Sequence, residues 1–280
     1  MDPDVRPRAV TGAPYGGGMT EVSYDRYCAE IVAQADLLRG AITGADLTAR
    51  VPSCPDWNAG QLVRHLGGAQ RWAAEAVRRR VTEPFAEDFR DLSAYASEDP
   101  DVVGPWLEAG AQELAATLRA AGPGTAMWTP VPAGTTDFYA RRFTHETAMH
   151  RADAVLALGQ DYALDPVIAA DGIDEWLALG SLPVMAEYFP ALLELLGPGR
   201  TIHLHATDTP AGAGAEWVVD LTGDWLAWRR AHEKSAVAVR GPVAELLLLI
   251  YRRRAPGSGA VEILGDAGLL DFWLDHVGFG

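Results

Sequence analysis

The sequence predicts an α+β protein in which a four-helix bundle precedes a smaller domain of helices and strands. Two observations support this order. Up to about residue 180, apolar residues recur at helical spacing, and glycine or proline closes each run. From residue 201 onward, apolar and polar residues alternate as they do in strands. We therefore divide the chain into four parts: a flexible tail over 1–20, a bundle over 21–165, a helical connection over 166–199 and an α+β domain over 200–280.

Four helices are expected in the first part. The apolar stripe over 23–43 ends at Gly44, a common helix stop. Asn58 followed by Gln61 has the form of a capping box, so a second helix should begin there and run to about residue 80. Two further helices are expected over 101–121 and 137–158. The connecting loops are expected over 51–58, over 81–100, which is long and acidic, and over 122–136, which is rich in glycine and proline.

The second part should contain both element types. Asp165 followed by Pro166 has the form of a helix N-cap with proline in the first helical position, which predicts a helix to about residue 179. Prolines and glycines then interrupt the pattern up to about residue 199. Beyond that point we expect strands over 201–207, 216–221, 236–240 and 261–264, with helices over 241–251 and 265–276.

Composition narrows the classes of function. The chain has 280 residues and a formal charge of -15, which argues against a nucleic-acid partner because phosphate binding requires Lys and Arg clusters. Its longest aliphatic run, over 246–250, is far shorter than the roughly 18 apolar residues of a membrane span. The start lacks the apolar core of a signal peptide. Cys28 and Cys54 form no CxxC or zinc-knuckle spacing, which is typical of a reducing compartment. We expect a cytoplasmic protein, monomeric or homodimeric, with no membrane association.

Three residues are candidate metal ligands. Glu146 and His150 lie four apart in a predicted helix and therefore on one helical face, and His65 lies two turns into the second helix. Inward-facing side chains on different helices build the metal sites of bundles. Two imidazoles and one carboxylate leave coordination positions open, as in catalytic centres. The alternative is an ordinary surface pair of Glu146 and His150, although the apolar residues around them place part of this helix against a core.

Other polar residues have weaker claims. His145 lies far round the helix from His150 and is interpreted as a surface residue or as one that supports a ligand, and Asp153, three after His150, is positioned to orient it. His203 and His205 share one face of a predicted strand and are suited to a metal, but no third ligand is evident nearby, which favours a partly exposed strand face. The remaining candidates are interpreted as structural: His232 as solvated, His276 as the last turn of a helix, Cys28 as core, Cys54 as a packed loop residue, and Trp57 and Trp72 as packing residues beside the His65 helix. Trp72, seven residues after His65, shares its face, so the alternative is that it lines the cavity of the site.

Four motifs in order resemble one known family. They are Cys54-Pro-Asp-Trp57, the helix with His65, the segment from Glu146 to Asp153, and Gly265-Asp-Ala-Gly-Leu-Leu-Asp-Phe-Trp273. The chain resembles, over about residues 20–280, the mycothiol-dependent maleylpyruvate isomerase family, whose members join a DinB-like bundle to a domain similar to sterol carrier protein two. The resemblance implies that His65, Glu146 and His150 bind a divalent metal, usually zinc, although other divalent metals suit this ligand set.

The resemblance also implies a basic residue and an external thiol. Family members usually read Tyr-Gly-Arg at one helix end of the second domain, which corresponds to Tyr251-Arg252-Arg253, so Arg253 is the matching position. Arg252 departs from the pattern, Arg254 is a neighbouring candidate, and arginine at a helix end is also explained by the helix dipole. Mycothiol is the implied thiol cosubstrate, and its thiolate would attack an electrophilic small molecule.

Two outcomes of that attack remain open, as does a third class of function. The thiolate would isomerise a cis double bond, as in maleylpyruvate, or would be transferred to its target. The long acidic loop and the Arg252 departure suggest a specialised substrate as a further hypothesis. The alternative is a non-catalytic binding or regulatory protein that keeps the bundle while the C-terminal domain holds an apolar ligand.

Overall fold

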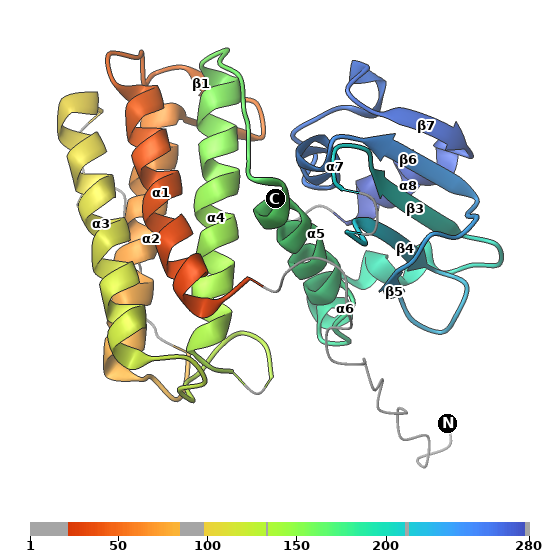
Figure 1. Cartoon of the computed structure of the whole chain (residues 1–280), viewed down its shortest axis with the longest axis horizontal. Helices are drawn as coiled ribbons and strands as arrows, with labels where there is room; N and C mark the ends of the chain where they lie inside the picture. Colours follow the sequence, from red (N-terminus) through yellow and green to blue (C-terminus); the bar gives the residue numbers. More distant parts are fainter. Residues whose placement is uncertain (1–21, 85–97, 133, 211–212, 278–280) are drawn as a thin grey trace.

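The computed structural model describes residues 22–84, 98–132, 134–210 and 213–277. Within these ranges a helical bundle lies beside a second half in which helices cover a sheet (Figure 1). The α+β order predicted from the sequence is therefore confirmed. The predicted tail over 1–20 and most of the predicted acidic loop lie outside the described residues. None of the described helices combines the length and the apolar character needed to cross a membrane.

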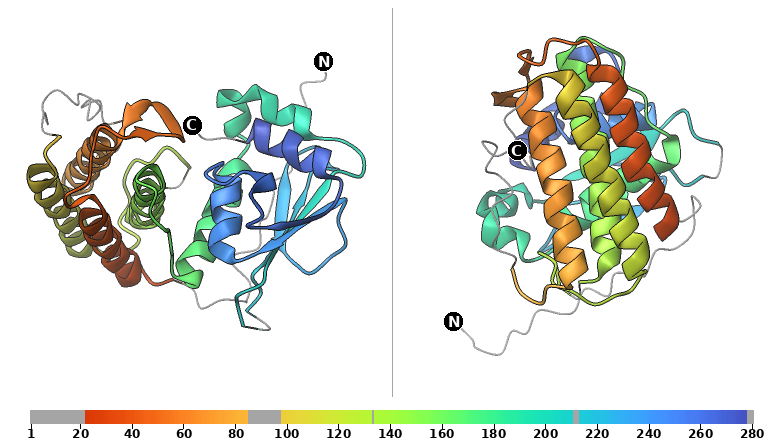
Figure 2. Two further views of the ribbon diagram at one scale, coloured as in Figure 1. Left: turned by 90° about the horizontal axis from the view of Figure 1, so that it is seen from above. Right: turned by 90° about the vertical axis from the view of Figure 1, so that its left-hand side faces the viewer.

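The first half is a bundle of four helices around one hydrophobic core (Figure 2). They are α1 (Tyr24–Ile42), α2 (Ala59–Arg79), α3 (Pro100–Ala121) and α4 (Thr136–Ala157). The predicted capping box is present at α2: Asn58 and Gln61 each accept a hydrogen bond from the other's backbone N–H, at 2.8 and 2.9 Å. Because this cap sets where α2 begins, it also sets the helical face on which His65 lies.

The second half begins with helices and continues as a five-stranded sheet. The helices before the sheet are α5 (Pro166–Gly180), α6 (Met185–Tyr188) and the 3-10 helix η2 (Pro190–Leu195). The strands are β3 (Thr201–Ala206), β4 (Glu216–Asp220), β5 (Ala227–Arg230), β6 (Val237–Gly241) and β7 (Glu262–Gly265). Between and after the last strands lie α7 (Val243–Ile250), η3 (Pro256–Ser258) and α8 (Ala267–His276). The strand order is β5-β4-β3-β6-β7, in which β3 and β6 are parallel and the other neighbours antiparallel.

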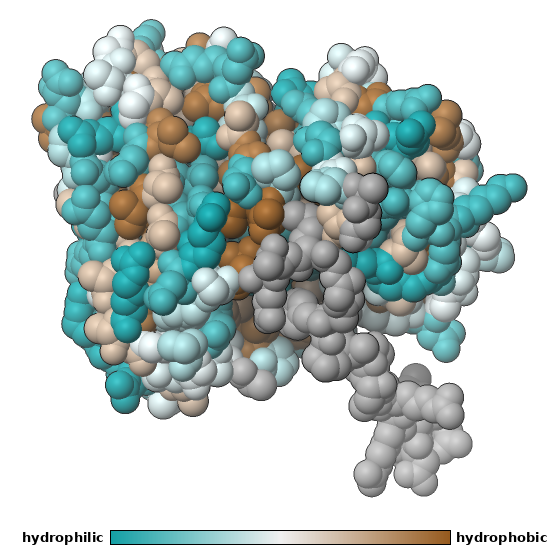
Figure 3. All heavy atoms as spheres, in the orientation of Figure 1, coloured by the Kyte–Doolittle hydropathy of each residue, from teal (hydrophilic) through white to brown (hydrophobic). Residues whose placement is uncertain are grey.

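Helix α4 contributes to two cores. Tyr139, Phe143 and Ala154 pack in the bundle core, whereas Met149 and Ala152 pack in the core that α5, α7, α8 and the sheet share. The core expected beside Glu146 and His150 therefore exists, but it belongs largely to the second half. On the face drawn in Figure 3, hydrophilic residues cover most of the surface, and a group of hydrophobic residues lies where the two halves meet. The second half is thus packed directly against the helix that carries two candidate ligands.

The structure differs from the prediction in two short segments. Residues 51–58, expected as a loop, contribute to a hairpin of β1 (Arg50–Val51) and β2 (Cys54–Asn58). Strand β5 was not expected either, because its sequence Ala-Trp-Arg-Arg lacks the apolar alternation of a half-buried strand. Both segments become strands because they pair with a neighbouring strand. The sequence of a single segment does not show such pairing. The turn of the hairpin reaches α4, where Ser53 contacts Asp153.

Candidate metal centre

The three predicted ligands lie together between α2 and α4. The ring centroids of His65 and His150 are 5.4 Å apart, and the ring planes are nearly perpendicular at 89°. On α4, Nε2 of His150 is 3.4 Å from Oε2 of Glu146. The four-residue spacing on α4 and the position of His65 on α2 thus bring two imidazoles and one carboxylate to one place. Their assignment as metal ligands stays a prediction.

Glu146 is accessible to solvent and surrounded by positive groups. Its side chain is 39 % exposed, and its Oε1 lies 3.2 Å from Nε of Arg142. Burial acts to raise the pKa of Glu146, but nearby positive charge, chiefly that of Arg142, outweighs it and holds this pKa below its usual value. Glu146 is therefore ionised near neutral pH. Its Oε2 is the oxygen that faces His150, so one oxygen is directed toward the imidazoles while the other is paired with arginine.

Asp153 lies directly behind His150. Its carboxylate is fully buried, and Oδ2 is 3.1 Å from Nδ1 of His150. Ser53, in the turn of the β1–β2 hairpin, donates a hydrogen bond to Oδ1 at 2.5 Å. Although burial raises the pKa of Asp153, hydrogen bonds from His150 and Arg253 lower it far more. An ionised Asp153 holds the proton of His150 on Nδ1 and leaves Nε2 as the electron-pair donor, in the direction of Glu146.

One arginine of the second half reaches this cluster. Nε and Nη2 of Arg253 donate to the two oxygens of Asp153 at 2.8 and 3.0 Å, and Nη1 donates to the carbonyl of Tyr251 at 2.7 Å. The neighbouring arginines point elsewhere, Arg252 to Asp275 and Arg254 to Glu245. Of the three arginines in this run, Arg253 is therefore the one that crosses from the end of α7 to the bundle.

Two domain families match this chain. The mycothiol maleylpyruvate isomerase N-terminal domain matches residues 28–155, and the MDMPI C-terminal domain matches residues 167–272. The chain belongs to the mycothiol maleylpyruvate isomerase family. Among solved structures, a crystal structure of the mycothiol-dependent maleylpyruvate isomerase and one of its histidine-to-alanine mutant are each 14% identical to this chain, with a TM-score of 0.56. Each match covers 88% of this chain and 95% of the other, and at this identity the likeness shows the fold. A search of curated proteins found no match.

The backbone before Arg253 has the conformation that glycine favours. Arg252 adopts a φ of 62°, in the left-handed region, at the position where the Tyr-Gly-Arg pattern compared in the sequence analysis has glycine. The helix end is closed there by the backbone N–H groups of Arg253 and Arg254, which both donate to the carbonyl of Leu248 at 2.8 and 3.2 Å. The departure in sequence therefore leaves the conformation that directs Arg253 intact.

Neither cysteine of this family member has the character of a nucleophile. Cys28 lies in the bundle core, as expected. Cys54 lies next to Ser53 in the hairpin, and burial raises the pKa of its thiol. A thiol with a raised pKa stays protonated at neutral pH, and the thiolate is the reactive form. Trp57, the last aromatic residue of the Cys-Pro-Asp-Trp motif, packs on His65 with 4.7 Å between ring centroids.

His145 is buried, which corrects its interpretation as a surface residue. Its Nε2 lies 2.7 Å from Oδ2 of Asp171 on α5, and Arg141 and Tyr27 also donate to this carboxylate. The face of α4 that carries His145 is covered by α5, an approach that the sequence of α4 does not reveal. His145 therefore joins the bundle to the second half, and it points away from His150 as expected.

A second group of histidines is assembled on the sheet. Sequence reasoning found no third ligand near His203 and His205, and that conclusion was wrong. Antiparallel pairing places Glu216 of β4 opposite His205, and His232, interpreted as solvated, lies 2.6 Å from Oε2 of Glu216. The sequence alone did not reveal the contacts of Glu216 with His205 and His232, because they depend on strand register and on the path of the chain after β5.

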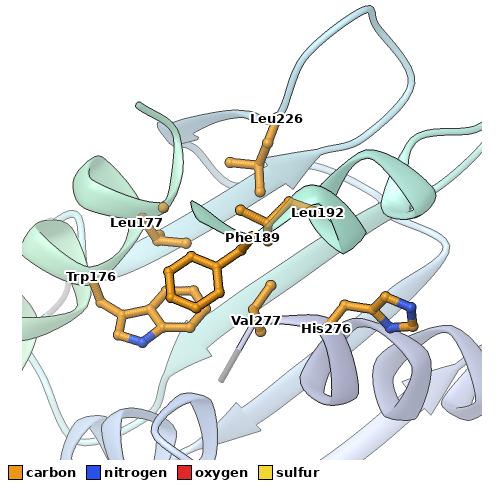
Figure 4. A pocket seen from close by; sticks show the side chains of 8 residues that line it. Trp176, Leu177, Phe189, Leu192, Leu226, His276 and Val277 are labelled. Carbon is orange, nitrogen blue, oxygen red and sulfur yellow. The ribbon is translucent and has the colours of Figure 1, made fainter. Parts of the chain in front are cut away.

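An apolar hollow lies elsewhere in the second half (Figure 4). It has an empty volume of about 360 Å³, including space open to solvent. Apart from Gly180 and His276 its lining is hydrophobic: Trp176, Leu177, Phe189, Leu192, Leu226 and Val277. His276 occupies the last turn of α8, as predicted. None of the candidate metal ligands, nor Arg253, lines this hollow, so it is separate from the candidate centre.

Proposed function

We propose that this protein is a divalent-metal, mycothiol-dependent enzyme in which the thiolate of mycothiol attacks an electrophilic small molecule that carries a carboxylate. The observation that carries the proposal is the convergence of His65, Glu146 and His150 at the point where Arg253 of the second half meets Asp153 of the bundle. Family membership supports the use of mycothiol.

The residues present fit a divalent cation, zinc in the first instance. His150 offers Nε2 because Asp153 engages Nδ1, and Glu146 offers an ionised oxygen. With His65 this makes three protein ligands of the kinds that zinc accepts, and it leaves a position for an external ligand. The cation would supply Lewis-acid stabilisation of a thiolate near neutral pH. Asp153 would fix the orientation of His150, a contribution that typically changes metal affinity or activity about 10–100-fold.

Arg253 would bind the substrate carboxylate. A guanidinium has five N–H groups. Three of those of Arg253 are engaged by Asp153 and by the Tyr251 carbonyl, so among the described residues two stay available. Because Asp153 orients both Arg253 and His150, the carboxylate-binding group and one metal ligand share a single support. A substrate held by Arg253 would thus be anchored from the second half while its reactive carbon faces the bundle.

The proposed isomerisation regenerates the thiolate and needs no further reagent. The thiolate adds to one carbon of a cis double bond conjugated to a carbonyl, and the electron pair moves onto the carbonyl oxygen. The former double bond is now single and rotates. Return of the electron pair expels the thiolate and restores the double bond in the trans form. In the transferase version the carbon–sulfur bond stays, and either a leaving group departs or a proton is taken up.

Turnover assays with matched variants test the proposal. Zinc-loaded wild type, His65→Ala, His150→Ala and His276→Ala are assayed with mycothiol and maleylpyruvate, and separately with mycothiol and an alkylating electrophile. We expect thiol-dependent turnover of at least one of these substrates by wild type and by the His276→Ala control, and its loss in the other two variants. Turnover that survives the loss of His65 and His150 would contradict the proposal.

The apolar hollow of Figure 4 keeps the non-catalytic alternative open. If the chain were a binding or regulatory protein, an apolar ligand would occupy this hollow, which Trp176 and Phe189 help to line. A fluorescent fatty acid would then bind to wild type and to His65→Ala equally, and Trp176→Ala would weaken it. Wild type that binds such a probe but turns over neither electrophile would favour this alternative.

A further inference from the structure

The sheet carries a cluster of four side chains with metal-binding chemistry, which we call the sheet cluster: His203 and His205 of β3, Glu216 of β4, and His232 just after β5. His203 and His205 are two apart on one strand and share one face, whereas Ile202 and Leu204 on the other face pack in the core with α7. The cluster therefore lies on the sheet face opposite the helices, which lie between the sheet and the bundle (Figure 2).

The ligand atoms of the sheet cluster converge on one point. Oε2 of Glu216 lies 2.9 Å from Nε2 of His203, 3.0 Å from Nδ1 of His205 and 2.6 Å from Nδ1 of His232. The three rings are almost equally spaced, with centroids 5.6 to 5.8 Å apart. All four ligand atoms lie within 4.8 Å of one another. In a tetrahedral zinc site with bonds of about 2.0–2.1 Å, neighbouring ligand atoms are roughly 3.3 Å apart. The three nitrogen–oxygen distances of the sheet cluster are shorter than this, so the Glu216 side chain would move outward as an ion takes the centre.

The cluster has the backbone support of a built site. Antiparallel pairing of β3 and β4 places His205 directly opposite Glu216, so their side chains leave the same face. The backbone N–H of Ala231 donates to the carbonyl of Glu216 at 3.2 Å, which holds the next residue, His232, beside that carboxylate. Three separate segments are thus fixed around one centre by main-chain hydrogen bonds.

The arginines of the strands beside the cluster are paired with carboxylates. Arg240 of β6, which is opposite His205 in the strand pairing, lies 3.1 Å from Glu262, and Arg229 of β5 is paired with Glu233 and Asp220, so both charges are compensated.

The cluster is open on one side. The His232 side chain is 77% exposed, whereas His203 is nearly buried. An ion can therefore arrive from solvent at His232 and Glu216 without disturbing the core. Because His232 is the most exposed of the four residues, its removal is expected to disturb folding least.

We propose that His203, His205, Glu216 and His232 form a second divalent-metal site that binds Zn²⁺ with four protein ligands. Such a closed shell is typical of structural zinc, because no position is left for substrate. The ion would link β3, β4 and the segment between β5 and β6. This site is independent of the proposed thiol chemistry, since its residues lie on the face of the sheet that points away from α7, whereas His65 and His150 lie on α2 and α4 of the bundle.

Metal stoichiometry in matched variants tests the proposal. Full-length protein is loaded with ZnCl₂, freed of unbound metal and analysed by elemental analysis as wild type, His65→Ala, the double variant His205→Ala and His232→Ala, the combination of all three, and His276→Ala as control. We expect about two zinc ions per chain in wild type and in the control, about one in His65→Ala, about one in the double variant and almost none in the combination.

The outcomes separate this proposal from the proposed function. If the double variant keeps the zinc content of wild type, the sheet site is wrong, whatever His65→Ala shows. If His65→Ala alone keeps its full content, the bundle site fails and the sheet site stands. Should folding of the double variant fail, the single variant His232→Ala removes only an exposed side chain. With Co²⁺ in place of zinc, the visible absorption of a tetrahedral ion is expected in His65→Ala, and its absence there would also overturn the proposal.

Discussion

The candidate centre of the bundle and the sheet cluster contain the same kinds of side chain, histidine and glutamate, but are built in different ways. In the bundle, His65 and the pair Glu146 and His150 come from two helices, and a buried carboxylate, Asp153, supports His150 from behind. On the sheet, three histidines surround a single carboxylate oxygen, and strand pairing supplies the support. With a bound ion, the first arrangement would leave a coordination position for an external ligand, whereas the second would fill a tetrahedral shell. The two proposals therefore differ in the number of protein ligands that converge and not in the type of ligand.

The largest effect is expected for the bundle ligands. His65→Ala should lower kcat/KM with mycothiol and the reactive electrophile on the order of 10³-fold, because two remaining ligands hold a cation poorly. His276→Ala, at the end of α8, should stay near wild type. A similar small loss in both variants would remove the functional distinction between the bundle centre and the sheet cluster.

The next effect concerns stability and the sheet cluster. With free zinc at 100 times its dissociation constant, a site present only in the folded state raises stability by about 2.7 kcal/mol. We expect a zinc-dependent rise in Tm for His65→Ala, and its disappearance when His232→Ala is added. Thermal unfolding followed by circular dichroism, with and without zinc, measures this. An unchanged rise after loss of His232 would mean that zinc stabilises the chain elsewhere.

Asp153→Asn should have an intermediate effect on the bundle centre. The amide cannot hold the Nδ1 proton of His150 as a carboxylate does, nor pair with Arg253 through two charged oxygens, so we expect a loss of about 10–100-fold in zinc affinity. Competition with a chelator measures the affinity. Because the sheet cluster has no counterpart to Asp153 among its ligands, its zinc should be retained in this variant, and loss of both ions would indicate general unfolding.

The contact between the halves should respond to acid. Burial raises the pKa of Asp171, but His145 and Arg141 outweigh it and lower this pKa to about 2. A carboxyl whose pKa is depressed in the folded state adds stability above its unfolded pKa of about 3.9, and this stability is lost as the pH falls toward 2. We expect a contribution on the order of 1–2 kcal/mol. Asp171→Asn should lower stability at pH 6 and flatten its acid dependence, as denaturant titrations at several pH values would show. Equal slopes for both proteins below pH 4 would argue against this assignment.

The smallest effect is expected at Arg252. A non-glycine residue in the left-handed region costs on the order of 1 kcal/mol, so Arg252→Gly should raise the free energy of unfolding by up to that amount. The exposed pair of Arg252 with Asp275 offsets little of this gain. Denaturant unfolding measures the change, and Arg254→Gly is not expected to stabilise. A destabilised Arg252→Gly would show that the arginine side chain contributes more than its backbone costs.

Local sequence was sufficient for most of the helical half. The capping box at Asn58 and Gln61 predicted where α2 begins, and the spacing of Glu146, His150 and Asp153 predicted their common side of α4. These relations hold within one helix, whose period is set by backbone hydrogen bonding. The pairing of the halves through His145 and Asp171 was missed, because it depends on which face of α4 another helix covers.

The order of helices and strands, the candidate ligands of the bundle and the position of Arg253 could all be predicted from the chain. That Arg253, and not Arg252 or Arg254, meets Asp153, and that Glu216 and His232 join His203 and His205, became visible in the folded structure alone. The difference lies in the sequence distance between the residues that interact. Helical spacing is repeated every few residues and is visible in the chain, whereas strand register, helix ends and the contact of two halves join residues far apart in sequence.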